Sequence, residues 1–233
     1  MFLQNSQKKI EEEFLKLTEK LGPDREPLKT ICEKLDGCGR ELGLAMKYLY
    51  VTAPYSDLVN YSFEELQDFA SHGLFLYNTL ERVKELPEEM FLNYILDHRV
   101  NEEEVLPCRS FFWNELKDRI EGKNAKDAAI EVNYWCAEEA TYHSGDDRTL
   151  PALTVYRRGY GRCGEESVFL VNALRSVGIP ARQVYVPRWS HCDDNHAWVE
   201  LWCDGKWYFT GACEPLMILN KGWFTNASSR AMM

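Results

Sequence analysis

The spacing of apolar residues changes at one point along this chain, and the change restricts the folds that are open to it. Through residues 168–177 apolar side chains recur every three or four positions, as on the buried face of a helix. Gly178-Ile179-Pro180 ends that pattern, because glycine terminates helices and proline cannot continue them. Beyond it the period becomes two, over residues 183–186 and most clearly over residues 197–202, which is typical of strands. We therefore predict an α+β protein in which an antiparallel sheet follows the helices.

Three strands are predicted, over residues 183–186, 197–202 and 206–210. Asp204-Gly205 separates the last two, and this dipeptide is a strong signal for a two-residue hairpin turn. The last two strands are therefore expected to be antiparallel neighbours.

The first half of the chain is predicted to be mainly helical. Ile10, Phe14 and Leu17 have helical spacing, and Ser62-Phe63-Glu64-Glu65 has the pattern of a capping box that starts a second long helix. We therefore expect a helical N-terminal region over residues 1–123 and a second domain over residues 124–233. The chain ends without an obvious closing signal, which is compatible with further domains beyond residue 233.

Composition excludes some functions. The formal charge of −10 argues against a nucleic-acid partner, because phosphates are bound by clustered Lys and Arg. No apolar run reaches the roughly 18 residues that span a bilayer, so membrane insertion is not expected. The chain start lacks the pattern of a signal peptide. The 8 cysteines have irregular spacing and no C-x-x-C pair, which predicts mostly free thiols. A cytoplasmic location is favoured, and an extracellular one stays open if a signal peptide has been removed.

Cys163 has the setting of a catalytic nucleophile. It lies at the start of a predicted helix, between Gly161 and Gly164. The helix N-terminus carries about half a positive charge, which is expected to stabilise a thiolate and lower the pKa of the cysteine. The first-turn N–H groups have no intrahelical partner and could form part of an oxyanion hole. A buried structural cysteine near a helix cap is the alternative reading.

His196 is the natural partner, because Asn195-His196-Ala197-Trp198 places it at the entry of a predicted strand. Its imidazole would take the proton from the cysteine and later give it to the leaving group. A third group is expected on the neighbouring strand, where Glu214 is the only carboxylate. The alternative interpretation is that His196 has a structural role only.

Three ordered motifs resemble the transglutaminase-like superfamily: Gly161-Arg162-Cys163-Gly164, Gly178-Ile179-Pro180-Ala181-Arg182 and His196-Ala197-Trp198-Val199-Glu200. The resemblance implies a papain-like core in which the nucleophile helix packs on an antiparallel sheet, with Cys163 as nucleophile and His196 as base. It covers about residues 124–215. The family's Asp-Pro on the next strand reads Glu214-Pro215 here, so Glu214 replaces the expected Asp as the third member of the triad.

Three aromatic residues are further candidates for the substrate groove. Trp135 lies on the helix before the nucleophile, where some relatives place an oxyanion donor, although core packing is the competing reading. Trp189 and His191 lie in the loop before His196 and could line the acyl groove.

These features predict a cysteine enzyme that acts on a peptide or protein amide and needs no cofactor or metal. Hydrolysis is the default, because water needs only an accessible site. Transfer to an amine, cleavage of a glycan-bearing amide and a non-catalytic peptide-binding or glycan-binding module remain alternatives. A zinc site is disfavoured because Cys192 and His196 form only one close pair of ligands. Ser167 lacks the G-x-S-x-G pattern of a serine nucleophile.

Overall fold

The computed structural model describes residues 2–145 and 148–231, and it divides into two compact units, Met1–His98 and Arg99–Met233. The predicted boundary lies later, between residues 123 and 124. The difference arises because helix α8 (Arg109–Leu116) packs on α11 (Cys163–Ser176) in the second unit. There, Arg109 Nε donates a 3.0 Å hydrogen bond to Asn172 Oδ1, and both side chains are buried.

The first unit is helical, as the apolar spacing predicts. Its helices are α1 (Gln7–Leu21), α2 (Leu28–Asp36), α3 (Arg40–Thr52), α4 (Tyr55–Asn60), α5 (Phe63–Thr79), α6 (Glu81–Lys84), α7 (Glu88–Phe91) and the π-helix η1 (Leu92–Leu96). The predicted capping box at the start of α5 is confirmed, because the Ser62 side chain accepts from the Glu65 N–H and the Glu65 side chain accepts from the Ser62 N–H. Helix α3 packs against α1 and α5 through a face that includes Leu49, which has no exposed surface.

The second unit combines helices with a small sheet. Besides α8 and α11 it contains α9 (Ala125–Glu139), β1 (Thr141–Tyr142), α10 (Ala152–Arg158), β2 (Tyr160–Gly161), β3 (Ala181–Val186), β4 (His196–Cys203), β5 (Lys206–Thr210) and α12 (Thr225–Ser228). β1 and β2 form a short parallel pair, and the other strands form an antiparallel sheet in the order β3-β4-β5. The α+β class is thus confirmed.

The hairpin between β4 and β5 confirms the turn predicted from Asp204-Gly205. Both turn residues have positive φ, 51° for Asp204 and 76° for Gly205, which is the backbone that a two-residue hairpin turn requires. The resulting register pairs Val199 with Thr210 and Trp202 with Trp207.

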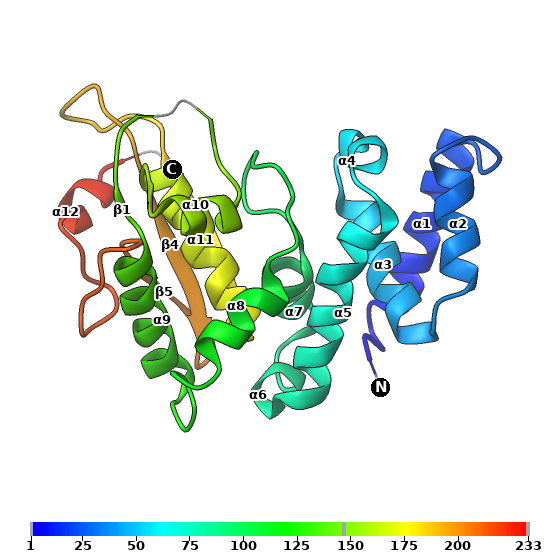
Figure 1. The fold of residues 1–233 in the computed structure, drawn as a ribbon, viewed down its shortest axis with the longest axis horizontal. Coiled ribbons are helices and arrows are strands. Elements are labelled where there is room, and N and C mark those ends of the chain that lie inside the picture. The colour runs from blue at the N-terminus through cyan, green and yellow to red at the C-terminus, as the bar shows by residue number, and fades with distance from the viewer. Residues whose placement is uncertain (1, 146–147, 232–233) are drawn as a thin grey trace. The chain divides into compact units, whose positions relative to one another are not determined.

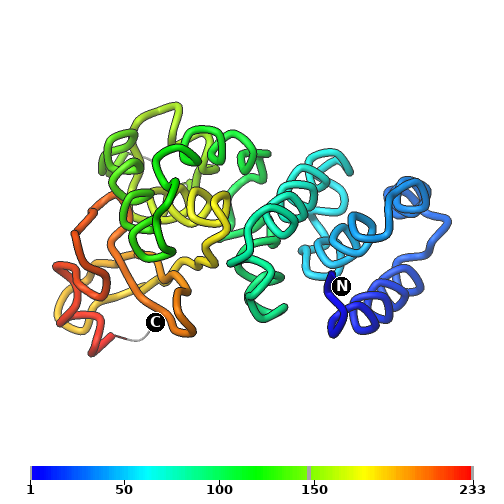
Figure 2. The backbone as a smooth tube through the Cα atoms, turned by 90° about the horizontal axis from the view of Figure 1, so that it is seen from below, coloured from blue at the N-terminus to red at the C-terminus, as the bar shows by residue number. Residues whose placement is uncertain are grey.

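Helix α11 packs directly against β3 and β4. Figure 1 and Figure 2 both show this helix, in yellow, beside the orange strands. Every residue from Glu165 to Ser176 is buried, so the helix is enclosed on nearly every side. Because the packing anchors α11 along its length, its first residue, Cys163, has a defined place next to the sheet.

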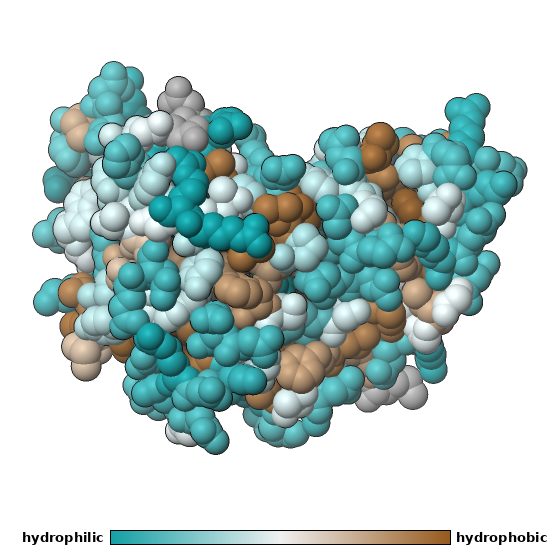
Figure 3. Space-filling view, viewed as in Figure 1, coloured by the Kyte–Doolittle hydropathy of each residue, from teal (hydrophilic) through white to brown (hydrophobic). Residues whose placement is uncertain are grey.

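The visible surface in Figure 3 is mostly hydrophilic, with apolar side chains scattered among polar ones. Among the described residues, no helix has the length and apolar character that crossing a membrane requires.

Candidate active site

Cys163 is the first residue of α11, and its side chain is partly exposed. The turn before it is held by Glu165, whose carboxylate accepts a 2.7 Å hydrogen bond from the Arg162 N–H and two more from the Arg162 guanidinium, at 3.1 and 2.7 Å. These hydrogen bonds between Arg162 and Glu165, the Arg162–Glu165 clamp, fix the first turn of the helix. The backbone of that turn then sets the position of the Cys163 thiol.

The predicted lowering of the Cys163 pKa is not observed. Burial raises the pKa of the thiol, and the carboxylates of Glu166 and Glu165 raise it further. Hydrogen bonds from the N–H groups of Ala197 and Gly164 lower it only in part. Burial therefore outweighs the helix N-terminus, whose N–H groups lower the pKa of Cys163 only in part. Cys163 is consequently a thiol, not a thiolate, at neutral pH.

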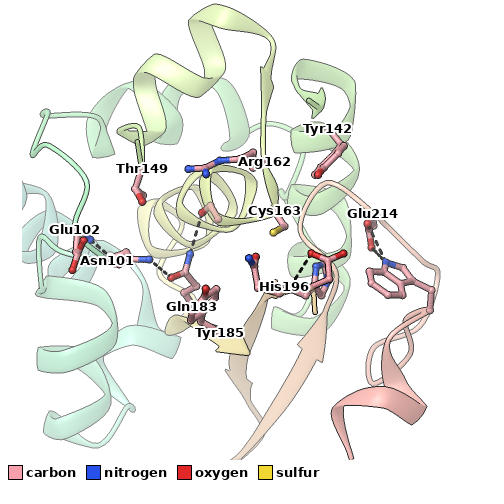
Figure 4. Close-up of a pocket in the computed structure, with 14 residues that line it drawn as sticks. Asn101, Glu102, Tyr142, Thr149, Arg162, Cys163, Gln183, Tyr185, His196 and Glu214 are labelled. Atoms are coloured by element: carbon pink, nitrogen blue, oxygen red, sulfur yellow. Dashed lines mark hydrogen bonds between the residues drawn. The ribbon is translucent and has the colours of Figure 1, made fainter. Parts of the chain in front are cut away.

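His196 lies at the entry of β4, and the N–H of the next residue, Ala197, reaches the sulfur of Cys163. The strand entry and the helix start therefore face each other, as Figure 4 shows for these two side chains. The predicted nucleophile and base thus meet at one place.

The imidazole of His196 is enclosed by aromatic rings. Its ring centroid lies 4.7 Å from that of Trp223, 4.9 Å from that of Phe224, and 6.1 Å from those of Trp189 and Trp198. Burial lowers the pKa of His196 to about 4, although Asp194 acts in the opposite direction. The imidazole is therefore uncharged at neutral pH and able to accept a proton.

Glu214 binds a different partner from the one predicted. Its two carboxylate oxygens accept hydrogen bonds from Trp223 Nε1, at 3.2 and 3.0 Å. Among the described residues, no hydrogen bond joins Glu214 to His196, and His196 Nε2 is buried without a partner. The indole of Trp223 contacts both Glu214 and His196, and it takes the place of the direct hydrogen bond that was predicted between them.

The end of β5 explains where the Glu214 carboxylate lies. A Cβ at position 211 would lie 2.6 Å from Glu214 Oε2, so the carboxylate occupies the space that a side chain at Gly211 would fill. The turn is held from α9: Asn133 Nδ2 donates to Gly211 O at 2.8 Å, and Asn133 Oδ1 accepts from the Cys213 N–H at 2.9 Å. The Glu214 side chain therefore points back along the chain and lies beside Gly211.

Glu166 is a second carboxyl close to Cys163, one turn along the same helix. It is 4% exposed, and no hydrogen bond to its carboxyl group is observed in the described part of the chain. Burial raises the pKa of Glu166 to about 8, with further contributions from Glu214 and Glu165. The carboxyl group is therefore mostly protonated at neutral pH.

The three aromatic candidates lie behind the site or away from it. Trp135 is 2% exposed and packs on Phe112, Tyr156 and Phe169, so it belongs to the core. Trp189 is 5% exposed and packs on His196, so it supports the base. His191 is exposed and its ring lies 6.2 Å from that of Trp189.

A cavity of about 810 Å³ opens beside Cys163 and His196. Its other lining residues come from loops and strand ends across the second unit: Asn101, Glu102, Tyr142, Thr149, Arg162, Gly164, Gln183, Tyr185, Asp194, Asn195, Glu214 and Trp223. None of the three aromatic candidates lines it. Trp223 and Tyr142 were missed because they lie outside the motifs in sequence, and Tyr185 was missed because its place on the predicted strand gave no sign that it faces the cavity. The Gly222-Trp223 dipeptide, which follows Glu214-Pro215 closely in sequence, was the one sequence signal that could have pointed to Trp223.

Gln183 on β3 links separate segments of this cavity by hydrogen bonds. Its side-chain amide donates to Gly164 O at 3.0 Å and to Ser167 Oγ at 2.6 Å, and its carbonyl accepts from Asn101 Nδ2 at 2.6 Å (Figure 4). The start of α11 is thus anchored to the sheet beside Cys163.

The cysteines do not form a metal centre. All 8 have free thiols, and the described residues contain no group of three or more His, Cys, Asp or Glu side chains that could hold a metal ion. Cys192, the one close neighbour of His196 considered as a zinc ligand, is exposed.

Comparison with known proteins agrees with this fold. Residues 114–212 match the model of the transglutaminase-like superfamily. The resemblance predicted from the three motifs is therefore confirmed. No curated protein matches the chain.

A solved structure called "a putative cysteine protease" from Cytophaga hutchinsonii is also similar, with 20% sequence identity and a TM-score of 0.39. The similarity covers 47% of this chain and 37% of that one, so it spans little more than a third of the other protein. A likeness at this level does not bear on activity.

Proposed function

We propose that this protein is a cysteine hydrolase of amide bonds, with Cys163 as nucleophile and His196 as general base. One observation carries the proposal: the Ala197 N–H reaches the Cys163 sulfur, so the thiol lies at the strand entry that bears a neutral histidine. Both residues line the same cavity, which gives a substrate access to them.

The raised pKa of Cys163 and the lowered pKa of His196 favour a neutral resting pair. In the first step the sulfur attacks the amide carbonyl carbon while the imidazole accepts the S–H proton. The C–N bond then breaks, the departing amine takes that proton, and a thioester to Cys163 remains. Water attacks the thioester with help from the same imidazole, which releases a carboxylic acid and restores the thiol.

The carbonyl oxygen of the substrate becomes negatively charged in the tetrahedral intermediate, and hydrogen-bond donors are needed to stabilise it. The Cys163 N–H is in the first turn of α11, where amides lack intrahelical partners. We assign this N–H to the oxyanion hole, since a preformed donor there is available without rearrangement.

In this proposal Glu214 supports His196 indirectly. The carboxylate holds the Trp223 indole by its N–H, and the indole packs 4.7 Å from the imidazole. Glu214 and Trp223 therefore act as positioning residues for the base, in place of a direct carboxylate–histidine hydrogen bond.

Labelling of the thiols with iodoacetamide at pH 7, followed by peptide mass spectrometry, tests the nucleophile. Cys163 should react more slowly than the exposed Cys192, because burial raises the pKa of its thiol and iodoacetamide reacts with the thiolate. Its rate should fall several-fold further in His196→Ala, since the imidazole takes up the thiol proton. Cys136 has no exposed surface and serves as an internal control for unfolding. An unchanged rate of Cys163 labelling in His196→Ala would argue for a non-catalytic module on this fold.

Amide hydrolysis by the wild type compared with Cys163→Ala completes the test. Hydrolysis should disappear in the variant while its circular dichroism and melting temperature stay unchanged. Retained turnover in Cys163→Ala would refute the proposed role.

A further inference from the structure

The cavity beside Cys163 carries negative charge that the described part of the protein does not neutralise. Glu102, Asp194 and Glu214 line it, and none of these carboxylates has a basic partner among the described residues. Arg162 is the one basic side chain in the lining, and its guanidinium is paired with Glu165 at 2.7 Å. A cleft lined by one sign of charge concentrates ligands of the opposite sign.

The catalytic pair does not offset this charge. Burial lowers the pKa of His196 to about 4, so the imidazole adds no positive charge at neutral pH. His196 and Cys163 both line this cavity, so the carboxylates gather beside the proposed catalytic pair.

Exposed aromatic rings share the cavity with these carboxylates. Trp223 is 65% exposed, Tyr142 61% and Tyr185 48%, although each lines the cavity. Large rings are usually buried, and a ring face beside carboxylates is a favourable site for an ammonium or guanidinium group. The rings and the carboxylates therefore point to the same kind of ligand.

We propose that the cavity selects a polypeptide substrate that carries a lysine or arginine side chain close to the amide attacked by Cys163. This inference rests on the proposed function, because it assigns the substrate of the same site. The cationic group would lie between the carboxylates of Asp194 and Glu102 and the exposed rings. A cavity of about 810 Å³ is large enough for such a side chain and the adjoining backbone.

Binding to full-length Cys163→Ala tests the selectivity without any turnover. Two pools of randomised short peptides are prepared that are identical except that one contains lysine and the other N-acetyl-lysine, which lacks the charge. Peptides retained by the immobilised protein at 50 mM salt are counted by mass spectrometry. Lysine peptides should be enriched at least fivefold over their acetylated counterparts, and the ratio should fall towards one at 500 mM salt.

Variants locate the effect in the cavity. Asp194→Asn and Glu102→Gln together should reduce the enrichment to less than half of its value. Asp118→Asn and Glu121→Gln remove the same number of charges from exposed positions that do not line the cavity, and they should leave the enrichment unchanged.

Three results would overturn the inference: equal retention of both pools, retention of neither, or an enrichment that the two pairs of variants reduce equally. Stronger retention of neutral oligosaccharides than of lysine peptides would also overturn it, in favour of a glycan ligand. Failure of the proposed chemistry is detected separately, because thiol labelling of Cys163 in the wild type and in His196→Ala does not depend on these peptides.

Discussion

The indole of Trp223 contacts both Glu214, whose carboxylate accepts its N–H at 3.0 and 3.2 Å, and the imidazole of His196, whose ring centroid is 4.7 Å from its own. Glu214 and His196 are thus connected through an aromatic ring. In a triad the acid would hold the imidazole by a direct hydrogen bond. Here the imidazole is held by packing, which fixes the ring plane and leaves Nε2 without a partner.

Loss of the Glu214–Trp223 contact should slow catalysis without unfolding the protein. Gly211→Ala places a Cβ 2.6 Å from Glu214 Oε2 and should displace the carboxylate, while Trp223→Phe removes the indole N–H. We expect each variant to lose about tenfold in kcat/KM, with the loss mainly in kcat, as for a group that positions a base. Steady-state kinetics and a melting curve for each variant check this.

The double variant provides the control. Because both changes break one contact, Gly211→Ala with Trp223→Phe should cost no more than either change alone. Additive losses would contradict a shared contact. Full activity in Trp223→Phe, accompanied by a large loss in Glu214→Gln, would instead favour a triad in which Glu214 acts on His196 directly.

The lowered pKa of His196 makes stability depend on pH. The unfolded residue binds a proton below its ordinary pKa of 6.5, whereas the folded one resists protonation down to about 4. The unfolded chain therefore holds more protons in this window, and stability falls as the pH falls from 6.5 to 4, by about 3 kcal/mol from this residue. Urea unfolding of the wild type and His196→Phe at pH 7 and pH 4 isolates the contribution. Parallel pH profiles for the two proteins would contradict it.

Glu166 should have the opposite effect. Its ordinary pKa of 4.5 is raised to about 8 in the folded state, so the folded chain holds an extra proton between these values. Stability from this residue is complete below pH 4.5 and is lost as the pH rises towards 8. Glu166→Gln keeps the shape and remains neutral, so it should stabilise the protein by up to about 3 kcal/mol at pH 7 and by little at pH 4.

Glu121→Gln is the matched control for that measurement, because Glu121 is exposed. It should leave the unfolding free energy unchanged at both pH values. If Glu166→Gln destabilises the protein at pH 7, the buried carboxyl has a partner that it needs in the ionised form.

Gln183 should matter for both stability and rate. Gln183→Ala removes hydrogen bonds to Gly164 O and Ser167 Oγ at the start of α11, which should cost about 1 to 2 kcal/mol of unfolding free energy. The start of the helix would then be less well fixed, and kcat should fall more than the melting temperature implies. Ser167→Ala, which removes one of the same bonds, should show a smaller loss of both. Unchanged kcat in Gln183→Ala would show that the first turn is held by the Arg162–Glu165 clamp alone.

Local sequence signals were sufficient for several elements of this fold. The capping box at Ser62, the stop at Gly178-Ile179-Pro180 and the turn at Asp204-Gly205 depend on backbone preferences over a few residues. The order of the motifs around Cys163 and His196 also identified the superfamily, because a helix start and a strand entry can be recognised in one dimension.

Properties that depend on surroundings needed the tertiary structure. Helix position alone predicted a lowered pKa for Cys163, but burial and the nearby acids raise it. Sequence order made Glu214 the partner of His196, but in the folded chain Trp223 contacts both residues. The charge and rings of the cavity come from segments as distant as Glu102 and Trp223. Motifs spaced along the chain thus determined which residues are candidates for the chemistry, whereas solvent exclusion and long-range packing decided their protonation and their partners, since both depend on residues that meet only after folding.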